Sequence, residues 1–359
     1  MEAKKTYQFK PNFAVPPGET LKEVMDSMGM TQKELAIRTE LTVQTLNRIF
    51  KGEQPITYET SDRLEMVTGI PARFWNNLEG LYREQLAKLE GLKQLETDLE
   101  WLKSMPTREL AERKYIELFS DKKELLRETL SFYGVSSASA WRGIWESPEV
   151  AARRSMCFES EPGPASAWLR MGEIEANKIT CSPYNKECFN NALMVIRSLT
   201  REEPAVFEPE MKRLCAESGV AVALVKEVKK VPWNGATKWL TPNKAMILLC
   251  LRGKGEDRFW FSFFHEAGHV LHDPKKSLYI NDGKELDPRE KKANRFAAQI
   301  LIPDKYNKEI RQISSDADIT RMAEKLDIAP GIVVGRYQHL TKKWSHFKKQ
   351  IKMLKWAQH

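Results

Sequence analysis

Apolar residues recur every three or four positions from about Pro17 to Ala87, and turn signals interrupt the pattern, so it predicts five short helices. Thr31 and Glu34 form a capping box that opens the second of these helices. Thr42 can cap a third helix, which runs to about Lys51. The whole segment is therefore expected to fold as a small helical domain.

The second and third predicted helices are joined by residues 39–41 alone, a connection short enough to set two helices at a steep angle, as in a helix-turn-helix. The helical period places five apolar residues on the inward face: Leu35, Ala36, Val43, Leu46 and Ile49. The outward polar residues, which we expect to meet bases and phosphates of duplex DNA, are Gln32, Gln44, Thr45, Asn47, Arg48 and Lys51. The same pattern also fits amphipathic helices whose polar faces are only solvated.

The pattern changes twice further along the chain. Residues 88–200 stay helical and charged, with breaks at Pro106, Gly134, Pro162 to Pro164 and Pro183, and we interpret them as a helical connector. The runs GVAVALVKEV, GATKWL and KAMILLCL, between residues 219 and 253, predict a small sheet with a hairpin. Helices are expected from there to the C-terminus. The prediction is a mainly α, α+β chain with three parts, 1–87, 88–200 and 201–359.

The amino-acid composition predicts where the protein is located and what class of partner it binds. Over 359 residues, Lys and Arg outnumber Asp and Glu by 57 to 49, and the net charge of +8 favours polyanionic partners. The five cysteines include no CxxC pair, which favours a reducing cytoplasm over a disulfide framework. No run approaches the roughly 18 apolar residues of a membrane helix, and no secretory signal opens the chain, so we expect no membrane partner.

The sequence HEAGH is the strongest chemical signal in the chain. His265 and His269 are four residues apart on a predicted helix, so both imidazoles project from one face and can hold one zinc ion. Glu266 lies one step round the helix, where it can take a proton from a zinc-activated water and pass it to the leaving amine. This pattern predicts a Zn²⁺-dependent peptidase. The competing interpretation is a surface helix that carries two histidines.

A third ligand is needed to leave the fourth zinc position open. Glu290 opens a following amphipathic helix and is the preferred candidate, and Asn294, one turn later, could orient a ligand. His272 follows His269 by three residues, and we interpret it as a structural or ligand-orienting histidine rather than a zinc ligand. If Glu290 proved dispensable, His272 or His339 would become the better third ligand.

Resemblances to two known protein families make these predictions more specific. The stretch from Gly29 to Leu78, with its KGEQPIT turn and IPARFWNNL ending, resembles the XRE-type helix-turn-helix of HigA-like antitoxins. It departs from them at Glu40, where the family usually has glycine. The resemblance implies a five-helix, lambda-repressor-like domain that binds a double-stranded DNA operator as a homodimer.

The segments around His265 and from Glu290 to Ala297 strongly resemble the ImmA/IrrE family of metallopeptidases. The runs GATKWLTPNKAMILLCLRG and IAPGIVVGRYQH resemble the branch of that family in which the peptidase follows an antitoxin-type DNA-binding domain. This resemblance implies a zincin-like domain, with a three-stranded sheet over a zinc-binding helical unit. It also implies activity toward repressor-like proteins.

The C-terminal segment GRYQHLTKKWSHFKKQIKMLKW mixes lysines with aromatic residues. We interpret it as an amphipathic helix with its aromatic side chains on the core and its lysines in solvent. The same mixture could also bind nucleic acid, with lysines on phosphates and aromatic rings on bases.

The leading functional prediction is a cytoplasmic DNA-binding regulator with a gluzincin-like zinc endopeptidase that cuts a repressor-like protein or itself. Its activity is expected to need a signal. The alternative is a non-catalytic, antitoxin-like repressor that binds DNA and a toxin partner and holds a structural zinc. The glutamate of HEAGH favours the enzyme, because a structural zinc has no need of it.

Overall fold

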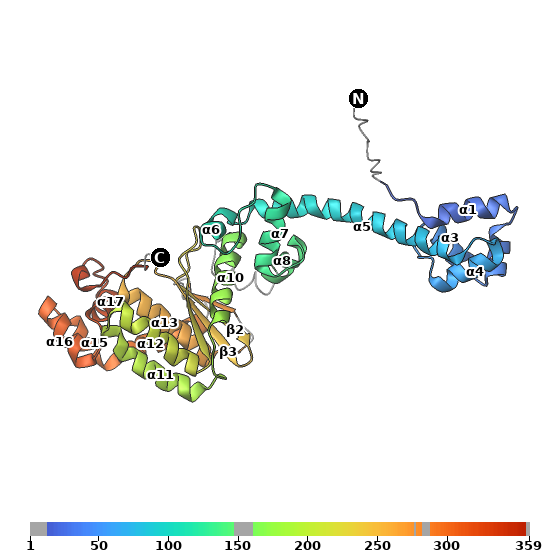
Figure 1. The fold of residues 1–359 in the computed structure, drawn as a ribbon. Helices are drawn as coiled ribbons and strands as arrows, with labels where there is room; N and C mark the ends of the chain where they lie inside the picture. The colour runs from blue at the N-terminus through green and yellow to red at the C-terminus, as the bar shows by residue number, and fades with distance from the viewer. Residues whose placement is uncertain (1–12, 147–160, 276–277, 282–287, 357–359) are drawn as a thin grey trace, which may run out of the picture. The chain divides into compact units, whose positions relative to one another are not determined.

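The computed structural model describes residues 13–146, 161–275, 278–281 and 288–356, which form helices and one small sheet (Figure 1). The described residues therefore confirm the predicted α+β class. The chain divides into two compact units, residues 1–99 and 100–359, which are described separately.

The N-terminal unit contains the five predicted helices. They are α1 (Pro17–Ser27), α2 (Gln32–Thr39), α3 (Val43–Phe50), α4 (Tyr58–Thr68) and α5 (Ala72–Lys103). The predicted N-caps are confirmed, because the hydroxyls of Thr31 and Thr42 accept hydrogen bonds from the backbone N–H groups of Glu34 and Thr45, but among the described residues no return bond from Glu34 completes the predicted capping box. The side chain of Glu34 pairs with Arg38, one turn along α2.

One apolar core holds these helices together, and it includes Leu35, Leu46 and Trp75, which are fully buried. Val43 is an exception to the predicted inward face, because its side chain is 39% exposed. It is the first residue of α3, and the part of that helix that packs begins at Leu46. Helix α1 lies close to α3 because Gly18 has no side chain: a Cβ there would lie 2.3 Å from the carbonyl oxygen of Ile49.

The turn between α2 and α3 keeps the backbone conformation typical of glycine, although Glu40 occupies it. Glu40 has φ 54° and ψ 29°, in the left-handed region. Its carbonyl oxygen and that of Thr39 accept hydrogen bonds from Arg63 of α4, each at 3.2 Å. Contacts with α4 therefore hold a conformation that costs a non-glycine residue roughly 1 kcal/mol.

We expect Glu40→Gly to stabilise the N-terminal unit by about 1 kcal/mol, because it removes this backbone strain. The exposed ion pair with Arg63, at 3.7 Å, adds little to stability. Amide hydrogens of α2 and α3 should exchange about fivefold more slowly by mass spectrometry. Glu53→Gly, at an exposed position without a positive φ, should not slow exchange. Equal rates in Glu40→Gly and the wild type would show that the turn is unstrained.

Helix α5 runs without a break across residue 87, into the segment interpreted as a connector. The helices that follow are α6 (Thr107–Glu112), α7 (Lys122–Tyr133), α8 (Ala138–Trp145) and α10 (Pro162–Lys178). Three predicted breaks mark their ends: Pro106 precedes α6, Gly134 closes α7 with a left-handed φ of 66°, and Pro162 opens α10. Residues 147–160 of the expected connector lie outside the described residues.

The second unit is built around a sheet with strand order β1-β3-β2-β4. Strand β1 pairs parallel with β3, while β2 pairs antiparallel with both β3 and β4. The strands are β1 (Val220–Leu224), β2 (Gly235–Thr241), β3 (Lys244–Leu249) and β4 (Leu278–Asn281). The helices of this unit that follow α10 are α11 (Lys186–Ser198), α12 (Pro204–Glu217), α13 (Glu256–His272), α14 (Pro288–Leu301), α15 (Asn307–Arg311), α16 (Asp316–Leu326) and α17 (Pro330–Thr341).

The two faces of the sheet carry different helices. Alternate residues of β3 point to opposite faces. Ile247 joins the core that contains Phe263 of α13, while Leu248 packs against Gly172 of α10. The predicted hairpin between β2 and β3 is confirmed. Helix α13 packs against β2 on one face of the sheet. Its histidines therefore lie on the same side of the sheet as the β2 residues that face this helix.

Two expectations for this unit are wrong. The sheet has a fourth strand, β4, whose four residues are too few to give a clear alternating pattern. The basic C-terminal segment is not a long helix, because α17 ends at Thr341 and Lys342 takes a left-handed conformation. The chain then turns back, and Met353 forms a bridge with Gly255 at the start of α13. The expected docking of this segment's aromatics holds for Tyr337 and Phe347, which pack on the core, but not for Trp344, which is 55% exposed.

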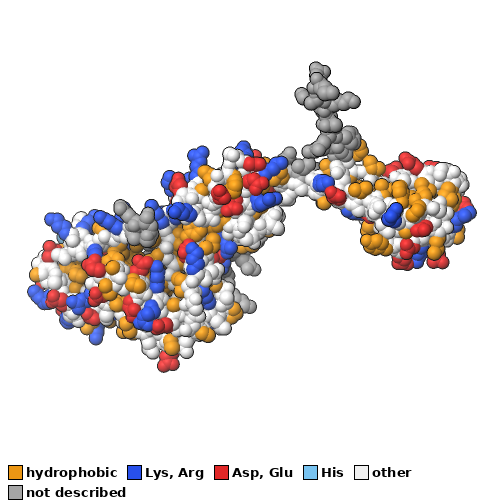
Figure 2. Space-filling view, viewed as in Figure 1, with side chains coloured by type: hydrophobic (Ala, Val, Ile, Leu, Met, Phe, Trp, Pro, Cys, Tyr) orange, Lys and Arg blue, Asp and Glu red, His pale blue; other side chains and the backbone are white. Residues whose placement is uncertain are grey.

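Charge on the second unit is mixed on the visible face. Figure 2 shows Lys and Arg side chains interspersed with Asp and Glu over that unit. Among the residues that the structure describes, no helix is long and apolar enough to span a membrane.

Candidate metal centre and nucleic-acid interface

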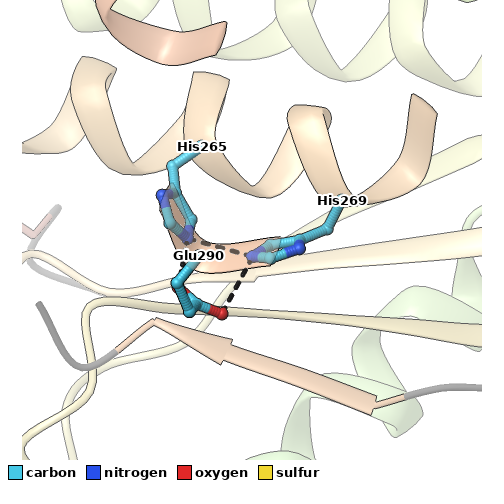
Figure 3. Close-up of side chains that lie close together, drawn as sticks. All are labelled: His265, His269 and Glu290. Atoms are coloured by element: carbon cyan, nitrogen blue, oxygen red, sulfur yellow. Dashed lines mark hydrogen bonds and ion pairs between the residues drawn. The ribbon is translucent and has the colours of Figure 1, made fainter. Parts of the chain in front are cut away.

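Three side chains from two helices meet in the second unit (Figure 3). His265 and His269 project from one face of α13 toward Glu290, in the first turn of α14. The Nε2 atoms of the two histidines lie 3.0 Å apart, and the Glu290 carboxylate lies 3.0 Å from one and 3.2 Å from the other. All three residues are buried. The structure thus brings together the three residues that the sequence proposed as ligands.

The outer nitrogen of each imidazole has its own partner. His265 Nδ1 lies 2.8 Å from Oδ1 of Asn294, and His269 Nδ1 lies 2.6 Å from Oδ2 of Asp273. These oxygens accept a hydrogen bond from Nδ1–H, which turns each Nε2 into the cluster. Both rings are therefore oriented as ligands for one cation.

Glu266 lies next to the cluster and is fully buried. The hydroxyl of Thr237 on β2 donates to Glu266 Oε2 at 2.6 Å. The other oxygen, Oε1, has no hydrogen-bond partner among the described residues. Gly235 faces that oxygen, and a Cβ at this position would lie 2.7 Å from it. Strand β2 thus fixes one carboxylate oxygen and leaves room beside the other.

Burial and hydrogen bonding move the pKa values of these groups apart. Burial raises the pKa of Glu266 above its ordinary value. Burial also opposes the charged forms of His269 and Glu290, but their hydrogen bonds prevail. Bonds with Asp273 and Glu290 raise the pKa of His269 to about 10, and bonds with the two histidines lower the pKa of Glu290 to about 2. At neutral pH the cluster therefore holds a proton that a cation would replace.

His272 does not join the cluster. Its ring packs edge-on against Phe296 of α14, with the centroids 5.3 Å apart. Burial lowers the pKa of His272, and so it is mainly neutral at pH 7. His339 is exposed on α17 and also lies outside the cluster. The geometry gives neither histidine a place at the cation.

The predicted DNA-contacting residues occupy α2 and α3 of the other unit. Gln44, Asn47, Arg48 and Lys51 are exposed, and Gln32 and Thr45 are half-buried. The amide nitrogen of Gln32 donates to Asn47 Oδ1 at 2.8 Å and to the carbonyl oxygen of Val43 at 3.3 Å. Gln32 therefore orients Asn47 on α3 rather than extending alone from α2.

Sequence reasoning missed two residues of the metal centre. Asp273 follows His269 by four residues, so the helical period alone could have placed its carboxylate beside that imidazole. Thr237 lies on a strand 29 positions before Glu266, and no local pattern connects them. Only the sheet topology shows that this hydroxyl reaches the glutamate.

Comparison with known proteins finds a family match in each of the two units. Residues 21–75 match the model of the helix-turn-helix family, and residues 230–334 match that of the IrrE N-terminal-like domain, peptidase family M78. The chain is also 27% identical over 66 residues to the uncharacterized HTH-type transcriptional regulator YddM of Escherichia coli K12. This match covers 18% of this chain and 70% of that protein. The chain therefore combines an XRE-like helix-turn-helix domain with an ImmA/IrrE-like domain of peptidase family M78.

Proposed function

We propose that this chain is a DNA-binding transcriptional regulator that carries a zinc-dependent, gluzincin-like endopeptidase. Its DNA-binding domain would occupy residues 1–87 and its peptidase domain residues 201–359, with the helical connector between them. The observation that carries the proposal is the buried carboxylate of Glu266, whose Oε1 lacks a partner among the described residues beside the His265–His269–Glu290 cluster.

The donor set fits zinc. Two imidazole nitrogens and one carboxylate are the ligands of catalytic zinc sites that keep a fourth position open. Ligands about 2.1 Å from a tetrahedral zinc lie roughly 3.4 Å from each other. Here the two Nε2 atoms lie 3.0 Å apart, and they lie 3.0 and 3.2 Å from different oxygens of the Glu290 carboxylate. Small outward movements would accommodate the ion.

The chain's own residues supply the acid–base chemistry. Zinc, when bound, would polarise the peptide carbonyl and make water a better nucleophile. Glu266 Oε1 accepts the proton of the attacking water and then donates it to the nitrogen of the leaving amine. Thr237 keeps the carboxylate in one orientation through Oε2. The raised pKa of Glu266 favours its role as base, because the carboxylate takes up a proton more readily than an exposed glutamate does.

The substrate that best fits a regulator with these two domains is a repressor-like protein or the chain itself. The helix-turn-helix domain would bind a double-stranded operator as a homodimer, and cleavage would change its occupancy. An antitoxin-like repressor with a structural zinc and a toxin partner would bind the same DNA without cleavage. The two proposals differ in whether the function requires the carboxylate of Glu266.

Arg48→Ala should weaken binding to the preferred operator by about 1–3 kcal/mol if Arg48 reads a base. The reason is its exposed position on α3, beside Asn47 and Gln44. Gel-shift titrations at fixed salt measure the loss, with Lys22→Ala on α1 as the control. Equal weakening on every duplex would make Arg48 a phosphate contact. If the wild type bound no genomic fragment, the DNA-binding proposal would fail.

The coupling of cleavage to transcription is tested in the native cell. A reporter on the protein's own promoter is compared in strains that carry the wild type and Glu266→Gln, under DNA damage and phage challenge. The variant should lock the reporter in one state while DNA binding stays intact. Identical responses, with identical immunoblots of the chain and of neighbouring regulators, would favour the non-catalytic repressor.

A further inference from the structure

A cavity of about 800 Å³ lies between α13, α14 and α17, next to the metal centre. On α13 it is lined by Arg258, Phe261 and Ser262. These residues precede His265 by seven, four and three positions, so they belong to the same stripe of the helix as the two histidines. The cavity therefore lies along the same stripe of α13 as the cluster, although none of the three cluster residues lines it.

Helix α14 forms the second wall. Lys291, Asn294 and Arg295 line the cavity, and they directly follow the ligand Glu290 along the same helix. Asn294 also holds His265 through the 2.8 Å contact with Nδ1. A molecule in the cavity would thus lie one side chain away from the metal, close enough to be the continuation of a chain bound there.

Among the described residues, the rim of the cavity carries more positive than negative charge. Arg336 of α17 pairs with Asp304 at 2.6 Å. Arg258, Lys291 and Arg295 are exposed, and no ion pair is found for them among the described residues. Asp257 is the remaining carboxylate that lines the cavity. Within the described part of the chain, three cations therefore face one carboxylate that is not in an ion pair, and this excess favours an anionic occupant.

Part of the cavity lining is apolar. The apolar lining residues are Leu301 at the end of α14, Ile302 directly after it, Ile332 of α17, Phe261 and Trp344. Leu301, Ile302 and Ile332 are buried, while Trp344 is 55% exposed. An occupant that fits both surfaces has an apolar side chain directed inward and acidic groups around it.

We propose that this cavity binds a segment of the protein substrate beside the scissile bond, in which acidic residues flank an apolar one. The inference rests on the proposed peptidase function and adds a substrate class to it. The cavity lies along the stripe of α13 that carries the two histidines, so an extended chain that leaves the metal centre would run between Arg258 and Arg295. Apolar contacts would seat its central side chain, and the rim cations would select carboxylates.

Binding to zinc-loaded, full-length Glu266→Gln tests the cavity without cleavage. The probes are three rhodamine-labelled octapeptides with one leucine–phenylalanine core, flanked by glutamate, glutamine or lysine. Fluorescence anisotropy at fixed salt should show at least tenfold tighter binding of the glutamate peptide than of the other two. Arg295→Glu, added to the same protein, should remove that preference and favour the lysine peptide.

A matched control separates the cavity from the overall positive charge. Arg321→Glu on α16 changes the net charge by the same amount, and Arg321 is exposed outside the cavity. It should leave the preference unchanged. Equal weakening by the two substitutions, or equal binding of the three peptides, would overturn the inference. Because no cleavage is measured, such a result would leave the proposed peptidase function standing. Absence of cleavage by the wild type, with selective peptide binding intact in Glu266→Gln, would count against the peptidase instead.

Discussion

Glu266→Gln should reduce the rate of peptide-bond cleavage by at least about a hundredfold, because it removes the general base and keeps the size of the side chain. The amide can still accept the hydrogen bond from Thr237, which is 2.6 Å from Oε2 in the wild type. Zinc content and operator affinity should stay at wild-type values. The measurement is the cleavage rate of the physiological substrate, with zinc quantified in the same samples.

Two further substitutions control this result. Thr237→Val removes the hydroxyl that orients Glu266 and should lower the rate by about 10- to 100-fold, a smaller loss than that of Glu266→Gln. Glu187→Gln, at an exposed position of α11, should have no effect. If Glu266→Gln cleaved the substrate as fast as Glu187→Gln, the base would have to be another group.

Loss of a ligand is expected to have the second large effect. Glu290→Ala should lower zinc affinity by more than about a hundredfold, because it removes one of three protein ligands and leaves His265 and His269 without their shared carboxylate. Competition with a chromophoric chelator measures the affinity. Asn294→Ala should cost less, about 10- to 100-fold, since Asn294 only orients His265. Full affinity in Glu290→Ala would require a different third ligand.

The same titration should depend on pH. The pKa of His269 is raised to about 10, so below that pH the zinc-free protein binds a proton that zinc must displace. Affinity should therefore rise with pH, by up to about tenfold per unit while this proton is released. Calorimetry in buffers of different ionisation enthalpy counts the released protons. Affinity that did not change between pH 6 and 8 would show that His269 is already neutral.

Local patterns in the sequence predicted most of the fold and the central residues of the site. The period of apolar residues gave the helices of the N-terminal unit, and capping residues such as Thr31 and Thr42 marked where they begin. The four-residue spacing placed His265 and His269 on one face of a helix. These features depend on neighbours in the chain, which a single sequence displays directly.

The features that the sequence did not predict depend on distant contacts. Thr237 reaches Glu266 only because β2 lies against α13. The C-terminal segment has the composition of an amphipathic helix, but Lys342 ends α17 in a left-handed conformation and Leu354 donates a hydrogen bond to the carbonyl of Lys254. Tertiary pairing there overrides local helical preference.

The most direct test of the peptidase is the set of new protein N-termini in cells that express the wild type or Glu266→Gln, labelled chemically and identified by mass spectrometry after DNA damage. The proposed function predicts at least one terminus, in this chain or in a repressor-like protein, that occurs with the wild type and not with the variant. The same set of termini in both strains under every inducing condition would contradict it.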